Sequence, residues 1–146
     1  MTLAVVLRYR TRRPWAPGPA SLRRWARAAA AGRRGELGIH VVDSRESRAL
    51  NARWRGRDKP TNVLSFPAAP GVRPVQIGDL VVCAPVVARE ARAQGKPLAA
   101  HWAHMIVHGT LHLLGFDHAR AADARRMEGR ERALLARLGF ADPYRD

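Results

Sequence analysis

Residues 108–118 read HGTLHLLGFDH, and this stretch predicts both the end of a helix and a metal site. His108 and His112 are four residues apart, so on a helix both project from one face about one turn apart. Gly115 can adopt the left-handed conformation that ends a helix, and the chain can then bring His118 back as a third ligand. Three imidazoles with an open fourth position are typical of catalytic zinc, whereas structural sites close all four positions with protein ligands.

The helix that carries these histidines has an apolar stripe at helical spacing, made of Ala103, Val107, Leu111 and Leu114. His108 and His112 lie on the opposite side, so we expect them to face a cleft rather than the packed core. His104 precedes His108 by one turn and is expected beside the metal ligands, as a hydrogen-bonding or proton-transfer group. An ordinary hydrogen-bonded histidine is the alternative for His104.

Two neighbours of the ligands decide which chemistry is possible. The ligand spacing is that of the metzincin proteases, in which a glutamate follows the first histidine and acts as general base. Gly109 occupies that position here, which argues against peptide hydrolysis. Asp117, next to the third ligand, could orient an imidazole or help proton transfer, and a turn or helix-cap aspartate is the alternative.

Along the rest of the chain, apolar alternation, helix caps, glycines and prolines predict strands separated by helices. The expected strands are Leu3–Arg8, Leu37–Val42, Val63–Phe66 and Gly78–Cys83. The expected helices are Ser21–Ala31, one capped by Asp43 or Ser44, Pro85–Gly95, Pro97–Leu114 and Ala121–Leu138. The expected loops are Thr11–Pro19, Arg55–Asn62 and Pro67–Gln76. Together they predict one α/β domain over residues 1–146, with a small mixed sheet of about four strands flanked by helices and a metal cleft in the C-terminal half.

The composition of the chain limits which partners and which cellular compartment are to be expected. The 26 basic and 12 acidic residues give a net charge of +14, which favours a polyanion such as nucleic acid. Only Lys59 and Lys96 are lysines, so the arginine excess could also reflect coding composition. The single cysteine, Cys83, is expected to be a buried thiol. Because we find neither a signal peptide nor an apolar stretch approaching about 20 residues, we expect a cytoplasmic protein.

Further motifs carry a resemblance to a known family. Residues 50–67 read LNARWRGRDKPTNVLSFP, residues 78–80 read GDL, and residues 138–144 read LGFADPY. With residues 108–118, these segments resemble the YbeY family of bacterial endoribonucleases. The corresponding family blocks are L-N-x-x-[YF]-R-x-x-D-x-P-T-[DN]-V-L-S-F-P, G-D-I and H-G-x-L-H-L-x-G-Y-D-H. Phe116 replaces the usual tyrosine, and we expect little effect from the lost hydroxyl.

The resemblance implies a zinc-dependent, single-strand-specific endoribonuclease that acts on RNA and the ribosome, in ribosomal RNA maturation and ribosome quality control. It implies that His108, His112 and His118 hold one zinc ion, that His112 and Arg55 serve catalysis, and that Arg55 also binds substrate. From the sequence we expect Arg55 in a loop after a helix, and a solvated arginine is its alternative.

Phosphodiester cleavage suits these residues, because a metal ion and an arginine can together stabilise charge on phosphoryl oxygens. We also expect Gly109 to leave open space beside the metal for a ribose-phosphate backbone. Two other functions stay open at this point: an RNA-binding factor for ribosome assembly with a structural metal, and a zinc peptidase or amide hydrolase.

Overall fold

The computed structural model describes residues 3–11, 16–69, 71 and 75–145. Strands and helices follow one another as β1 (Ala4–Arg10), α1 (Pro19–Ala30), β2 (Glu36–Val42), α2 (Ser44–Arg55), β3 (Val63–Pro67), β4 (Gln76–Cys83), α3 (Ala84–Gln94), α4 (Leu98–Leu113) and α5 (Ala121–Arg137). The predicted order of four strands and five helices is confirmed. Parts of two expected loops, residues 12–15, 70 and 72–74, lie outside the described residues.

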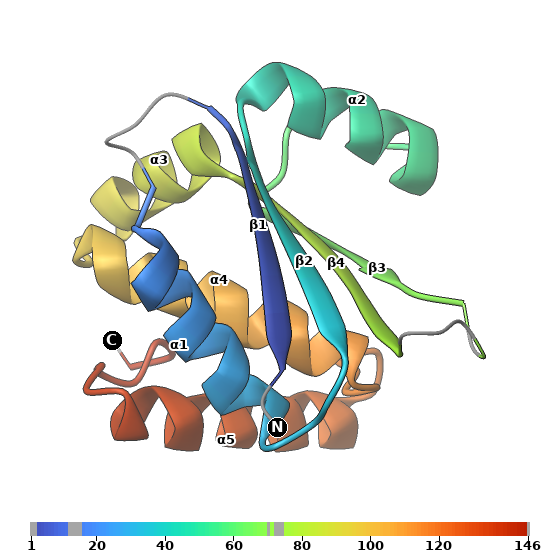
Figure 1. The fold of residues 1–146 in the computed structure, drawn as a ribbon. Coiled ribbons are helices and arrows are strands. Elements are labelled where there is room, and N and C mark those ends of the chain that lie inside the picture. The colour runs from blue at the N-terminus through green and yellow to red at the C-terminus, as the bar shows by residue number, and fades with distance from the viewer. Residues whose placement is uncertain (1–2, 12–15, 70, 72–74, 146) are drawn as a thin grey trace.

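The four strands form one mixed sheet in the order β1-β2-β4-β3. β1, β2 and β4 run parallel, and β3 runs antiparallel to β4. The parallel strands are joined through helices, whereas β3 reaches β4 through a short connection, as antiparallel pairing permits. β3 therefore forms one edge of the sheet, and Figure 1 shows it on the far side from β1.

The core lies between one face of the sheet and α1, α4 and α5 (Figure 1). Alternate residues of β2, namely Leu37, Ile39 and Val41, are completely buried on this face. α4 crosses the centre of the domain and is buried on several sides, with Trp102 and Ile106 completely inaccessible. A smaller apolar cluster beneath α2 covers part of the opposite face of the sheet. α4 can therefore hold histidines at fixed positions in relation to the sheet.

Several helix boundaries follow the local signals in the sequence. Asp43 caps α2, its Oδ1 accepting a hydrogen bond from the backbone N–H of Glu46 at 3.1 Å, and Gly95 ends α3 in the left-handed conformation. The expected start of the first helix at Ser21 is wrong by two residues. α1 begins at Pro19, because a proline in the first turn needs no backbone N–H donor.

None of the described helices is both long enough and apolar enough to cross a membrane. Cys83 is buried with a free thiol, as predicted.

Candidate active site

A cleft of about 350 Å³ lies where the end of α2, β3 and the C-terminal half of α4 meet. Its lining includes three arginine or lysine residues and three histidines, namely Arg55, Arg57, Lys59, His108, His112 and His118. The structure thus gathers the three predicted metal ligands and the predicted functional arginine around one opening.

The rings of the three histidines lie close together in this cleft. Ring centres are 6.0 Å apart for His108 and His112, 5.8 Å for His108 and His118, and 5.3 Å for His112 and His118. Three imidazoles bound to one tetrahedral zinc at about 2.0–2.1 Å would have ring centres about 5 Å apart. A small inward movement of the rings is enough to reach that spacing.

Hydrogen bonds decide which nitrogen each ring presents to the cleft. Nδ1 of His108 lies 3.1 Å from a carboxylate oxygen of Glu131, and Nδ1 of His112 lies 2.9 Å from the carbonyl oxygen of Phe116. Because an ionised carboxylate and a carbonyl only accept, both Nδ1 atoms donate, and in the neutral rings both Nε2 atoms keep a free lone pair. This donor arrangement is common for metal-binding histidines, so the residues present fit a divalent metal ion.

The end of α4 explains how His112 acquires its partner. The N–H of Gly115 donates to the carbonyl of His112, and the N–H of Phe116 donates to the carbonyl of Leu111, both at 3.1 Å. These two bonds, with Gly115 at φ +101°, form the Schellman motif that commonly ends helices. The turn directs the Phe116 carbonyl back toward the His112 ring, so a missing tyrosine hydroxyl at residue 116 does not affect this contact.

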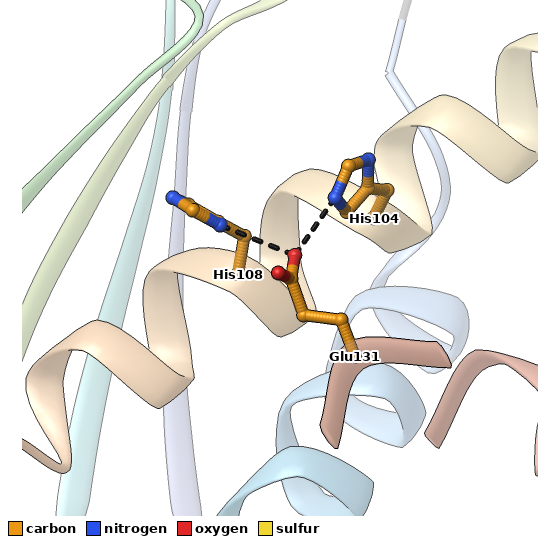
Figure 2. Close-up of side chains that lie close together, drawn as sticks. All are labelled: His104, His108 and Glu131. Atoms are coloured by element: carbon orange, nitrogen blue, oxygen red, sulfur yellow. Dashed lines mark hydrogen bonds and ion pairs between the residues drawn. The ribbon is translucent and has the colours of Figure 1, made fainter. Parts of the chain in front are cut away.

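Glu131 of α5 is the centre of a buried hydrogen-bond network behind the cleft (Figure 2). Its Oε2 accepts from Nε2 of His104 at 2.8 Å as well as from His108, and its Oε1 accepts from the hydroxyl of Tyr144 at 2.8 Å. Burial raises the pKa of the Glu131 carboxyl, but the hydrogen bonds from His104 and His108 outweigh it and hold the pKa at about 2. Glu131 is therefore an anion that orients both histidines.

By distance alone, His104, His108 and Glu131 are also a possible metal-binding group. Within the described part of the chain, they are the one group of three or more histidine, cysteine or acidic side chains whose ligand atoms all lie within 4.8 Å of one another. Their separations are those of hydrogen bonds, and Figure 2 shows the second nitrogen of His108 directed away from Glu131. His108 can thus belong to this network through Nδ1 and to the cleft through Nε2.

Glu131 was not predicted from the sequence, although a signal for it exists. It stands in α5 at helical spacing from Met127, Leu134 and Leu135, which are all buried in the core. A charged residue within an apolar stripe requires a buried partner, because an unpaired buried charge is costly. That conflict in the sequence could have marked Glu131 as part of a site.

Arg55 was expected in a loop after a helix, but it is the last residue of α2. The helix continues to Arg55 because Gly56, at φ +71°, supplies the left-handed cap one residue later. The Nη2 atom of Arg55 donates to the carbonyl of Ser65 on β3 at 3.1 Å. This contact holds the guanidinium at the rim of the cleft, and its other N–H groups can bind a ligand.

Asp117, the remaining predicted residue, makes contacts within its own turn. Oδ1 of Asp117 accepts from the backbone N–H groups of His118, at 2.7 Å, and of Ala119, at 3.2 Å. The bond from His118 contributes most to lowering the pKa of the Asp117 carboxyl, which caps the turn that carries the third histidine.

The expectation of open space at Gly109 is wrong. A Cβ atom there would lie 2.8 Å from Cδ2 of Leu80 and 3.3 Å from Cγ2 of Val63. Gly109 is buried against the sheet and permits the close approach of α4 to β3 and β4. Its absent side chain serves helix–sheet packing instead of making room for a substrate.

A family model described as "Endoribonuclease YbeY" matches residues 20–139. The chain belongs to the YbeY family. The match includes α2, β3, α4 and α5, and therefore every residue of the cleft and of the Glu131 network except Tyr144.

Curated YbeY relatives match most of the chain. "Endoribonuclease YbeY" of Halorhodospira halophila is 64% identical over 121 residues, which cover 79% of this chain and 78% of that protein. The protein of the same name from Alkalilimnicola ehrlichii is 60% identical over 137 residues, covering 88% of this chain and 82% of the relative. That of Methylococcus capsulatus is 54% identical over 132 residues, covering 89% of this chain and 88% of the relative.

A solved structure supports the fold independently. The solution structure of TM1509 from Thermotoga maritima matches with a TM-score of 0.58 at 22% sequence identity. The match covers 97% of this chain and 100% of that chain, so the two proteins share the arrangement of the whole domain.

Proposed function

We propose that this YbeY-family protein is a zinc-dependent, single-strand-specific endoribonuclease. The observation that carries the proposal is the meeting of His108, His112 and His118 with Arg55 in one cleft. The names of the relatives support the same reaction, since three of them are called endoribonucleases.

The three histidines would hold the metal through the Nε2 atoms of His108 and His112 and a ring nitrogen of His118. A zinc ion bound by three imidazoles supplies Lewis-acid chemistry that stabilises charge on phosphoryl oxygens. Glu131 and the Phe116 carbonyl keep the His108 and His112 rings in the required tautomer and orientation. His112 thus serves catalysis as a metal ligand and needs no separate role as a base.

Arg55 would bind the phosphate on the opposite wall of the cleft. A guanidinium offers paired N–H donors that match phosphate oxygens, and Arg55 lines the cleft while it is anchored on Ser65. Arg57 and Lys59 extend the positive charge along the same wall, where flanking phosphates of an RNA strand would lie.

As the biological role we propose ribosomal RNA processing in the cytoplasm, in small-subunit rRNA maturation and ribosome quality control, with RNA and the ribosome as partners. The net charge of +14 is in keeping with a polyanionic partner of this kind.

The test is cleavage of a single-stranded RNA by purified protein, with and without a chelator, beside His112→Ala and His40→Ala. His40 lies on β2, where it contacts Asp79, and is the matched control for loss of an imidazole outside the cleft. We expect chelator-sensitive cleavage by the native and His40→Ala proteins and little by His112→Ala. Tight RNA binding without cleavage would favour the assembly-factor alternative, and chelator-sensitive digestion of casein would favour a peptidase.

A further inference from the structure

Trp54 is the most exposed large apolar side chain in the described part of the protein, with 58% of its surface accessible. Trp25 and Trp102, by contrast, are buried in the core. Leaving an indole in water forgoes the hydrophobic stabilisation that its burial would give.

The Trp54 ring is held in place although it is exposed. The rings of Trp54 and of Phe66 on β3 pack edge to face, with centres 6.3 Å apart and planes at 74°. The guanidinium carbon of Arg53 lies 5.2 Å from the centre of the Trp54 ring, on the ring surface. More than half of Trp54 remains accessible with both contacts in place, so the indole can contact a ligand.

Trp54 is next in sequence to Arg55, a residue that lines the candidate active site. It precedes Arg55 in α2, and both residues contact β3, Trp54 through Phe66 and Arg55 through the carbonyl of Ser65. Ser65 and Arg55 line the cleft, and Figure 1 shows the end of α2 near β3 at the edge of the sheet. Trp54 itself does not line the cleft, so an RNA strand has to extend beyond Arg55 at this edge to reach the indole.

The surroundings of Trp54 indicate the chemistry of its partner. Residues 53–59 contain Arg53, Arg55, Arg57 and Lys59, and the acidic Asp58 pairs with Arg48 at 2.7 Å. Trp54 is thus a flat apolar ring in a segment of mainly positive charge. It suits a ligand that combines flat aromatic groups with closely spaced negative charges, which is the make-up of single-stranded nucleic acid.

We propose that Trp54 is a stacking subsite for an unpaired nucleobase that flanks the scissile phosphate, and this inference rests on the proposed function. Bases in a duplex stack on one another and pair, so only an unpaired base can lie on the indole. Trp54 thereby contributes to selectivity for single strands, while Arg55 and the metal site act on the phosphate.

The experiment compares native protein, Trp54→Phe, Trp54→Ala and Leu98→Ala on a short single-stranded RNA. Leu98 is an exposed apolar residue at the opposite end of α4 and serves as the control. We expect Trp54→Ala to raise KM and the dissociation constant by about 5- to 100-fold with kcat little changed, and Trp54→Phe to retain most of the binding. Thermal unfolding verifies that each variant is folded.

A second arm places a single abasic nucleotide at successive positions along the RNA. At one position, the missing base should weaken binding to the native protein but should not weaken binding to Trp54→Ala further. Equal binding of all RNAs by native and Trp54→Ala proteins would overturn the inference and favour a protein partner for this residue. The arm can be measured by equilibrium binding alone, so absence of cleavage would refute the proposed function without deciding the role of Trp54.

Discussion

The Oε2 atom of Glu131 lies 3.1 Å from Nδ1 of His108, and this contact joins α5 to the candidate metal site on α4. The same oxygen accepts from His104, so one buried carboxylate fixes two imidazoles one helical turn apart. The position of the His108 ring therefore depends on a residue that lies outside the metal cleft.

Glu131→Gln should weaken metal binding by about 10- to 100-fold, because the amide is a poorer acceptor and cannot favour the Nδ1–H form of His108 as a carboxylate does. Competition with a coloured chelator measures the affinity. Glu90→Gln is the matched control, since Glu90 accepts from His101 at 2.9 Å without contacting a predicted ligand. Unchanged metal affinity in a folded Glu131→Gln protein would exclude this positioning role.

Metal content distinguishes the two possible ligand groups. If His108, His112 and His118 hold the ion, elemental analysis should find one metal per chain in native protein and His104→Ala, and almost none in His112→Ala or His118→Ala. The opposite pattern, with metal lost in His104→Ala and retained in His118→Ala, would instead assign the ion to the buried group around Glu131.

Arg55→Lys should lose much of the activity, because an ammonium group cannot reproduce the two parallel hydrogen bonds of a guanidinium. Arg55→Glu should lower kcat/KM on single-stranded RNA by about 10²-fold or more through repulsion of the phosphate. Arg92→Glu makes the same charge change on α3 and should have only a small effect. Similar rates for Arg55→Glu and Arg92→Glu would remove Arg55 from the site.

RNA affinity should decrease steeply with salt concentration, because arginines that bind backbone phosphates release counterions. With roughly five phosphate contacts, the dissociation constant should increase by about 100-fold between about 50 and 200 mM salt. Fluorescence anisotropy with a labelled oligonucleotide gives the slope. A nearly flat dependence would mean that the charge of +14 reflects arginine-rich composition and little binding.

Gly109→Ala should lower the free energy of unfolding by about 1 kcal/mol, because crowding against Leu80 and Val63 outweighs the gain in helix propensity. Gly129→Ala is the control, since a Cβ on that α5 glycine meets no described heavy atom within 4 Å. It should stabilise the protein by up to about 1 kcal/mol. Urea denaturation compares the two, and equal stabilisation would contradict the packing role of Gly109.

The sequence by itself determined the features that depend on neighbouring residues. The spacing of His108 and His112 put both on one helical face, Gly95 and Gly115 marked where helices end, and Asp43 marked where one begins. These signals are local, because a helix turn or a cap involves residues within about five positions of one another. For the same reason, the order of strands and helices was predicted correctly from the sequence.

Only the tertiary structure decided which distant residues meet at the site. Glu131 reaches His108 because α5 packs against α4, and Arg55 at the end of α2 reaches the carbonyl of Ser65 on the edge strand β3. From the sequence alone, open space was expected beside Gly109, but Leu80 and Val63 of the sheet occupy that space. Periodicity indicates which face of a helix is apolar, but contacts between distant segments depend on how the elements pack, and that packing is a property of the whole chain.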